Sequence, residues 1–136
     1  MPAIEIRDLT VRSGPYPVVE KLTLDIDEGE TVAISGPLPL ARILLHTLSG
    51  LVAPFSGSVL IYHQPPRQAL FRGLVQLIEG PQSSFVLPST PVVLLWNLFP
   101  TPPIPAHQTL IFCPPFIDHS RMNIVNINKW IRLKEP

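Results

Sequence analysis

The stretch that decides the fold reads TVAISGPLPLARILLHTLSG and covers residues 31–50. Its first five residues form an apolar run that is typical of a central strand in a sheet covered on both faces. From Leu40 onward, apolar side chains recur at helical spacing along one face, which predicts a helix from about residue 40 to residue 49 that ends at Gly50. The stretch therefore predicts a buried strand, a short loop around Gly36-Pro37 and a helix packed by one face.

A loop in this position can hold phosphate when it has the form G-x-x-x-x-G-K-[ST], because its backbone N–H groups, lysine and hydroxyl surround the anion and its Mg²⁺. Laid on Gly36, the pattern puts Ala41 at the second glycine, Arg42 at the lysine and Ile43 at the hydroxyl residue. Ala41 adds a Cβ, Pro39 removes an N–H donor, and Ile43 cannot coordinate a hard cation. Arg42 could still contact a phosphate, but the simpler interpretation is a loop that leads into a buried helix.

On either side of this stretch the pattern is that of short strands. Residues 4–11 and 22–27 alternate apolar with polar side chains, and a turn rich in glycine and proline, residues 13–17, separates them. Residues 58–62 and 74–78 are further strand candidates. The order predicts an α/β domain in which an antiparallel β layer leads into the strand, loop and helix.

The second half of the chain has a different character, because half of the eighteen prolines lie in residues 81–115. Within this segment only residues 92–99 could form a short helix, and no long helical arm fits. Residues 108–113 read as another buried strand. Residues 123–133 are expected to form a terminal hairpin with its turn at Asn128-Lys129.

Composition limits the classes of function. The 136 residues make one domain by length, with ten basic and ten acidic residues and no formal net charge. No stripe of Lys or Arg is present, which argues against nucleic acid as a partner. The apolar runs are too short to insert in a bilayer, and the start lacks a signal-peptide pattern, so we expect a soluble intracellular chain. The four histidines have no metal-ligand spacing, and Cys113 is the single cysteine, which rules out an internal disulfide.

A contact surface for a protein partner is expected, because 46% of the residues are hydrophobic and only 15% are charged. The candidate lies in the proline-rich segment, where apolar side chains are expected to be exposed. Its residues are Leu94, Leu95, Trp96 and Phe99.

Taken together, the segments resemble the ATP-binding cassette of ABC transporters, most strongly over residues 4–61. In that family a β layer of the form I-x-I-x-x-L-T leads through L-x-L-x-I-x-x-G-E-x-x-x-I-x-G-P to the phosphate loop, and Gly-Leu and S-G-x-I follow the helix. The matching residues here are 4–10, 22–37, 50–51 and 56–59. The resemblance implies a P-loop NTPase core with an N-terminal antiparallel β layer, truncated and without the helical subdomain, as a single domain over residues 1–136.

The resemblance also implies a nucleotide site, whose positions depart from the family's pattern. These positions are Gly36, Ala41, Arg42 and Ile43, with Tyr16 as a substitute for the aromatic residue that stacks on adenine. A cassette ATPase needs a strand that ends in Asp-Glu, to bind Mg²⁺ and to polarise water, yet no acidic residue lies between Glu79 and Asp118. That strand, the signature loop and the switch histidine are expected to be missing.

Two functions stay open, since the loss of lysine, hydroxyl, acid pair, signature and switch together conflicts with a third, an active ATPase. The first is a non-catalytic cassette-like subunit without a cofactor, structural or regulatory, that contacts a membrane transporter component, an intact ABC ATPase or another complex subunit. The alternative is an ATP-binding subunit that retains nucleotide weakly and without Mg²⁺ and does not hydrolyse it efficiently. In both, we expect a cytoplasmic protein that reaches the inner membrane only through a partner.

Overall fold

A computed structural model describes residues 2–79, 89–96, 107–113 and 127–134 of the chain. The elements in chain order are β1 (Pro2–Ser13), β2 (Tyr16–Asp27), β3 (Thr31–Ser35), α1 (Leu38–Leu48), β4 (Ser56–Ile61), α2 (Pro66–Phe71), β5 (Val75–Glu79), β6 (Val92–Trp96), β7 (Thr109–Cys113) and β8 (Lys129–Arg132). The predicted strand, loop and helix at residues 31–50 are confirmed, and the helix begins two residues earlier than expected.

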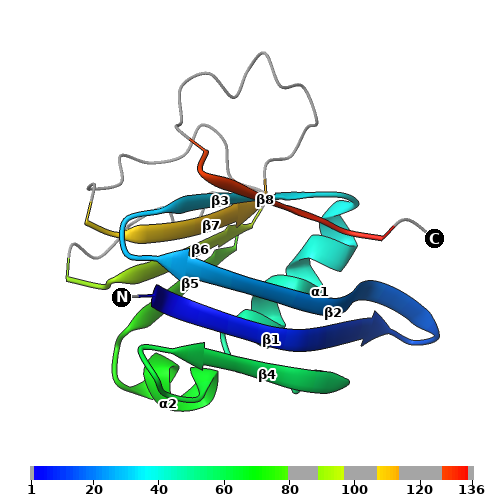
Figure 1. Ribbon diagram of the computed structural model, residues 1–136, viewed down its shortest axis with the longest axis horizontal. Helices are drawn as coiled ribbons and strands as arrows, with labels where there is room; N and C mark the ends of the chain where they lie inside the picture. The colour runs from blue at the N-terminus through cyan, green and yellow to red at the C-terminus, as the bar shows by residue number, and fades with distance from the viewer. Residues whose placement is uncertain (1, 80–88, 97–106, 114–126, 135–136) are drawn as a thin grey trace.

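Helix α1 lies between two sheets (Figure 1). One sheet is antiparallel and three-stranded, in the order β2-β1-β4. The other is parallel and five-stranded, in the order β5-β6-β7-β3-β8. This arrangement confirms the predicted α/β class with an antiparallel β layer that leads into a parallel core.

Burial follows the two strand patterns of the sequence. In β1 the alternate residues Ile4 and Ile6 are fully buried toward α1, whereas β3, β6 and β7 are buried along most of their length because both faces of the parallel sheet are covered. Successive strand residues point to opposite faces. Val32 and Ile34 therefore join the core around α1, and Ala33 joins a second cluster on the far face.

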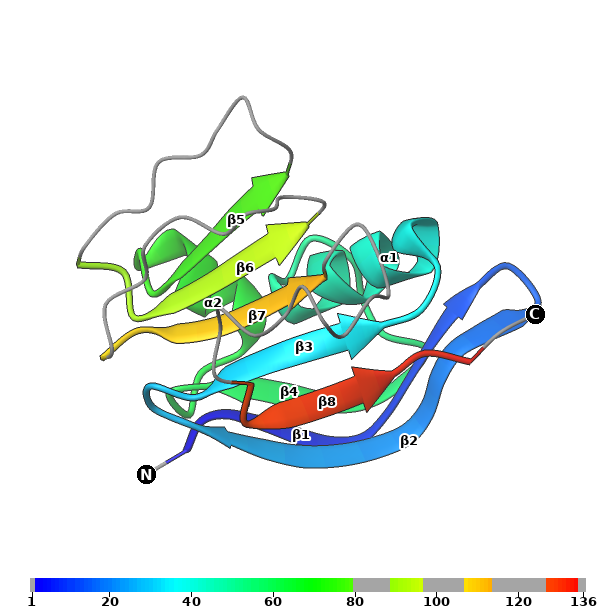
Figure 2. The ribbon, with the colours of Figure 1, turned by 90° about the horizontal axis from the view of Figure 1, so that it is seen from above.

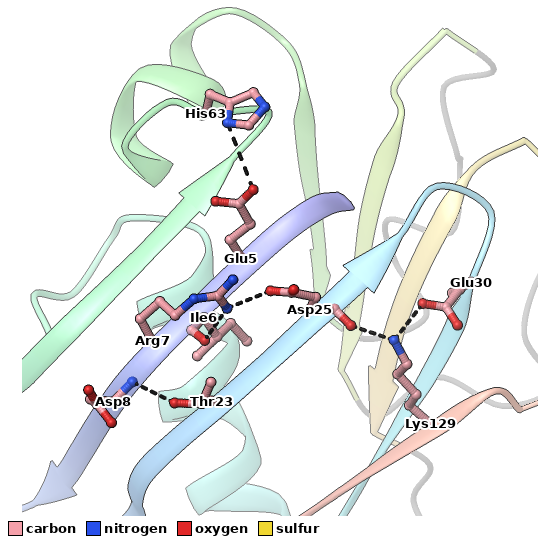
Figure 3. A network of polar contacts seen from close by, with 9 residues as sticks. All are labelled: Glu5, Ile6, Arg7, Asp8, Thr23, Asp25, Glu30, His63 and Lys129. Atoms are coloured by element: carbon pink, nitrogen blue, oxygen red, sulfur yellow. Dashed lines mark hydrogen bonds and ion pairs between the residues drawn. The ribbon is translucent and has the colours of Figure 1, made fainter. Parts of the chain in front are cut away.

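Ion pairs connect the last strand to the antiparallel layer (Figure 3). The Lys129 ammonium, at the start of β8, donates to the Asp25 backbone carbonyl and to Glu30 Oε1, the latter at 2.9 Å. Arg7 of β1 pairs with the Asp25 carboxylate. Arg7 and Lys129 hold the pKa values of Asp25 and Glu30, respectively, below their ordinary range. Each of these two acidic residues therefore pairs with a nearby cation.

Two expectations for local structure were wrong, and one helix was not anticipated. Of residues 92–99, predicted as a short helix, Val92–Trp96 form β6 instead, because they pair with β5 on one edge and β7 on the other, and residues 97–99 lie outside the described residues. The turn predicted at Asn128-Lys129 does not form, since Lys129 is the first residue of β8 and pairs in parallel with Val32 of β3. The first arm of that hairpin lies outside the described residues. Helix α2, six residues long, was not anticipated.

Candidate functional site

The loop after β3 passes directly into α1. Pro37 is the N-cap residue, and its carbonyl accepts hydrogen bonds from the N–H groups of Leu40 and Ala41 at 3.1 and 3.0 Å. Pro39, in the first turn, has no N–H to offer. A phosphate cradle needs several backbone N–H groups that point outward together. Here the helix itself uses the amide of Ala41, the residue at the second glycine position.

Gly36 is covered by the chain that follows β8. It has a φ of +150°, and a Cβ built on it would lie only 2.7 Å from the Cβ of Leu133. The Leu133 N–H donates to the Ser35 carbonyl at 2.9 Å, and the Lys134 N–H donates to the Val18 carbonyl at 3.0 Å. The C-terminal strand therefore fixes both the loop and the β1–β2 hairpin.

Tyr16 lies at the turn of that hairpin, as the first residue of β2, and is 56% exposed. Figure 2 shows the hairpin turn and the start of α1 at the same end of the molecule. The link through Val18 and Lys134 to Leu133 places the turn close to Gly36. An exposed aromatic ring thus lies at the loop's end of the fold.

Arg42 pairs with Glu79, the last residue of β5. Its Nε donates to Glu79 Oε1 at 2.7 Å, and His46 Nε2 lies 2.6 Å from the same oxygen. The Arg42 guanidinium, followed by His46, holds the pKa of Glu79 below its ordinary value against the opposing effect of burial. The same pair raises the pKa of Arg42. The cation at the lysine position is thus already matched by an internal carboxylate.

Trp96, the last residue of β6, completes this cluster. Its Nε1–H donates to the Leu38 carbonyl at 2.8 Å, and the Arg42 guanidinium carbon lies 5.5 Å from its ring centroid, within cation–π range. An open pocket of about 300 Å³ lies here, lined by Pro39, Arg42, Ile43, His46 and Trp96. Three elements, α1, β5 and β6, therefore meet in one polar and aromatic site at the carboxyl ends of the strands.

The described residues contain no group of three or more His, Cys, Asp or Glu side chains that could hold a metal ion. Burial raises the pKa of the Cys113 thiol to about 11, so this side chain is an inert core residue. Within the same residues, neither helix has the length and apolar character that crossing a membrane requires.

The candidate site is the pocket beside α1 together with the loop that precedes the helix.

Comparisons with known proteins give relatives over part of the chain. No protein-family model matches it. The chain is 33% identical over 89 residues to the phosphonates import ATP-binding protein PhnC 2 of Albidiferax ferrireducens. The aligned stretch covers 65% of this chain and 31% of that protein. It is 35% identical over 63 residues to the sulfate/thiosulfate import ATP-binding protein CysA of Pectobacterium atrosepticum. This aligned stretch covers 46% of this chain and 19% of that protein. The chain thus spans less than a third of the length of these relatives.

Solved structures match over nearly the whole chain. A putative ABC transporter ATP-binding protein of Pyrococcus furiosus superposes with a TM-score of 0.65 at 14% identity, over 96% of each chain. CbiO1 of Clostridium perfringens, part of the ABC transporter complex CbiONQ, gives a TM-score of 0.69 at 12% identity, over 98% of this chain and 87% of that one. The fold is that of an ABC ATPase core. The resemblance to ATP-binding cassettes indicated by the sequence is confirmed.

Within the cassette fold, the predicted nucleotide positions lie at different places around the beginning of α1. Arg42 and Ile43 line the pocket, whereas Ala41 is fully buried on the opposite face of α1. Gly36 lies under Leu133, and Tyr16 lies at the hairpin turn. Ala41 and Arg42 differ in burial because successive helical side chains point in different directions.

The predicted contact surface is largely wrong, because exposure was inferred for what is a central strand. Leu94 and Leu95 are completely buried in β6, one on each face of the parallel sheet. Trp96 is partly buried and lines the pocket, and Phe99 lies outside the described residues. Residues 92–96 therefore hold the cassette core together.

The proline-rich segment, for which no strand was predicted, contains β6. This parallel strand ends at the candidate site with Trp96, and the sequence has no acidic residue between Glu79 and Asp118. Sequence reasoning therefore missed β6 and, with it, the contact of Trp96 with Arg42. The available signal was Val92 to Leu95, an apolar run rich in β-branched residues and short enough for a buried strand.

Proposed function

We propose that this cassette-fold chain is a subunit of an ABC-type complex that acts through protein contact and does not hydrolyse ATP. The proposal rests on the loop after β3, whose phosphate-binding groups have other partners within the chain. The Ala41 amide is used within the helix, and Arg42 is paired with Glu79. Phosphoryl transfer depends on positioned cations and a water-orienting group, whereas β6 ends in Trp96 and the sequence has no acidic residue between Glu79 and Asp118.

The proposed partner is a membrane component of a transporter, an intact ABC ATPase or another subunit of such a complex. Support comes from the names of the relatives, which are ATP-binding proteins of import systems, and from CbiO1, which is part of a transporter complex. The loop-bearing core and its β layer keep the cassette arrangement even where the loop chemistry departs from it. Through such a partner the chain would work at the cytoplasmic face of the inner membrane.

A second candidate is a subunit that retains nucleotide without efficient hydrolysis. The relatives' names favour it, since each describes an ATP-binding protein. The exposed ring of Tyr16, at the loop's end of the fold, offers a surface on which adenine could stack. In this case the base rather than the phosphates would supply most of the binding energy.

Two measurements on the purified full chain separate these functions. Phosphate release from ATP is measured with Mg²⁺, and thermal unfolding is measured with no ligand, with ATP and Mg²⁺, and with ATP and EDTA. A ligand that binds only the native state must raise the unfolding temperature. We expect no phosphate release and no shift; a shift without release supports the second candidate, and release of phosphate refutes both.

The contact part of the proposal has its own test. Affinity capture of the chain from its own cells should return a membrane component of an ABC transporter, an intact ABC ATPase or another subunit of such a complex. A capture that returns none of these contradicts this part, whatever the nucleotide measurements show.

A further inference from the structure

Glu79 occupies an unusual position, because one of its oxygens serves two side chains of α1. Arg42 and His46 are one turn apart on the helix and both reach Glu79 Oε1, at 2.7 and 2.6 Å. The Glu79 side chain is 30% exposed, and that of His46 is 22% exposed. This carboxylate is therefore held partly out of water by a pair of nitrogen groups, as a bound oxyanion would be.

The remaining wall of the pocket is apolar and aromatic. The Trp96 ring lies beside the Arg42 guanidinium, and Pro39 and Ile43 complete the lining. Among the described residues, Glu79 is the acidic group that neutralises Arg42. Without the charge of Glu79, the pocket would present an uncompensated guanidinium and an imidazole next to an open space.

We propose that the Arg42 and His46 nitrogens form a latent oxyanion site at the edge of the pocket. The Glu79 carboxylate contacts both nitrogens, and we propose that it is the built-in occupant of this site and excludes phosphate and similar small anions. Arginine binds carboxylate and phosphate through the same N–H donors, and the Arg42 Nε–H already donates to Glu79, so a phosphate would compete with the carboxylate for that donor. An internal carboxylate on a neighbouring strand has a high effective concentration, which favours it over a free anion. The negative charge of Glu79 therefore keeps anions from Arg42, although the pocket itself is open.

This inference rests on the proposed function in one respect, since it explains how the cation at the lysine position is withheld from phosphate. It concerns the regulation of that position and makes no statement about ATP turnover. The test therefore uses inorganic phosphate as the probe and Trp96 fluorescence as the signal. The chain has two tryptophans, so every variant carries Trp130→Phe to leave Trp96 as the single emitter.

Phosphate is titrated into the Trp130→Phe parent and into the same protein with Glu79→Gln, with chloride at equal ionic strength as the blank. We expect no saturable change in the parent. The Glu79→Gln variant should give a saturable change with an apparent affinity at least about tenfold higher than any in the parent, because the charge-assisted donors are released. Adding Arg42→Gln to that variant should abolish the gain.

The matched control is Glu20→Gln, which removes a carboxylate from the exposed pair with Lys134, away from the pocket. It should bind no more phosphate than the parent, and a gain there would mean a general charge effect. A second variant, Glu79→Ala, tests whether the amide introduced by Glu79→Gln contributes to phosphate binding by itself. Circular dichroism shows whether each variant is folded. The proposal is overturned if the parent binds phosphate as tightly as Glu79→Gln, or if neither folded Glu79 variant gains binding.

The two proposals fail separately. ATP hydrolysis by the natural chain would refute the proposed function and leave the phosphate titration as it stands. The absence of a gain in both Glu79 variants would refute the latent site, while a non-hydrolysing subunit would remain supported.

Discussion

The two faces of α1 differ in the contacts that hold them: apolar packing on the inner face and specific polar contacts on the outer face. The inner face packs between the two sheets, and its side chains Ala41, Leu44, Leu45 and Leu48 are fully buried. The outer face carries Arg42 and His46, whose partner Glu79 comes from a strand far along the chain. The inner face depends on helical periodicity and general hydrophobicity, whereas the outer face depends on a few specific long-range contacts. Folding and site chemistry can therefore change independently on one helix.

The largest expected effect is a difference in the free energy of unfolding between substitutions on the inner and the outer face of α1. Leu44→Ala removes a fully buried side chain from the inner face and should lower the free energy of unfolding by about 2–5 kcal/mol. Ile43→Ala, the neighbouring residue on the partly exposed face, should cost clearly less. Urea unfolding measures both, with similar m-values if the unfolded state is unchanged. Equal losses would show that the outer face is as well packed as the inner one.

A smaller effect is expected where the loop meets the C-terminal strand. Gly36→Ala adds a Cβ that would meet Leu133 at 2.7 Å and places alanine at a positive φ, so a loss of about 1–3 kcal/mol is expected. Gly14→Ala is the matched control, because Gly14 has a φ of +59° and nothing within 4 Å of a new Cβ. Unfolding in urea should show a smaller loss for the control.

The same contact predicts a coupling between two residues. In a Leu133→Gly background the penalty of Gly36→Ala should shrink toward that of the Gly14 control, since the atoms that the new Cβ meets all belong to Leu133. An unchanged penalty would mean that backbone strain alone accounts for the loss. The loop would then not depend on the C-terminal strand.

Most of the framework could be predicted because its signals are local. Residues 31–35 form a continuous apolar run, residues 4–7 alternate with period two, and the buried face of α1 repeats with helical period, so neighbouring residues suffice. The failures have a physical origin as well. The periodicity of the run at residues 92–96 does not separate a buried strand from a buried helix. Its shortness and its two valines favour a strand, and the pairing with β5 and β7 settles it.

The candidate site could be predicted only in part. The motif located Arg42, but not Glu79 or Trp96, because the contacts of Arg42 depend on the register of β5 and β6 in the parallel sheet. The covering of Gly36 by Leu133 likewise joins residues from opposite ends of the chain. Sequence spacing carries no information on such contacts unless the sheet order is already known.

The smallest expected effect is the dependence of the outer face on pH. The pKa of Glu79 in the folded protein is lowered from its ordinary value of about 4.5, first by Arg42 and then by His46. A carboxylate with a lowered folded pKa contributes stability above its unfolded pKa, and this contribution is lost as the pH falls through the folded pKa. The stability difference between the natural chain and Glu79→Gln should therefore shrink on acidification from about pH 6 to about pH 3.

Asp25 and Glu30 also have lowered pKa values, so acid should destabilise both proteins, and only the difference between them reports on Glu79. Urea unfolding at several pH values measures that difference. Leu44→Ala provides the contrast, because its loss comes from buried apolar volume and should be nearly independent of pH. A stability difference for Glu79→Gln that stays constant with pH would mean that the carboxylate is not ionically engaged on α1. The outer face would then be held, like the inner one, by packing alone.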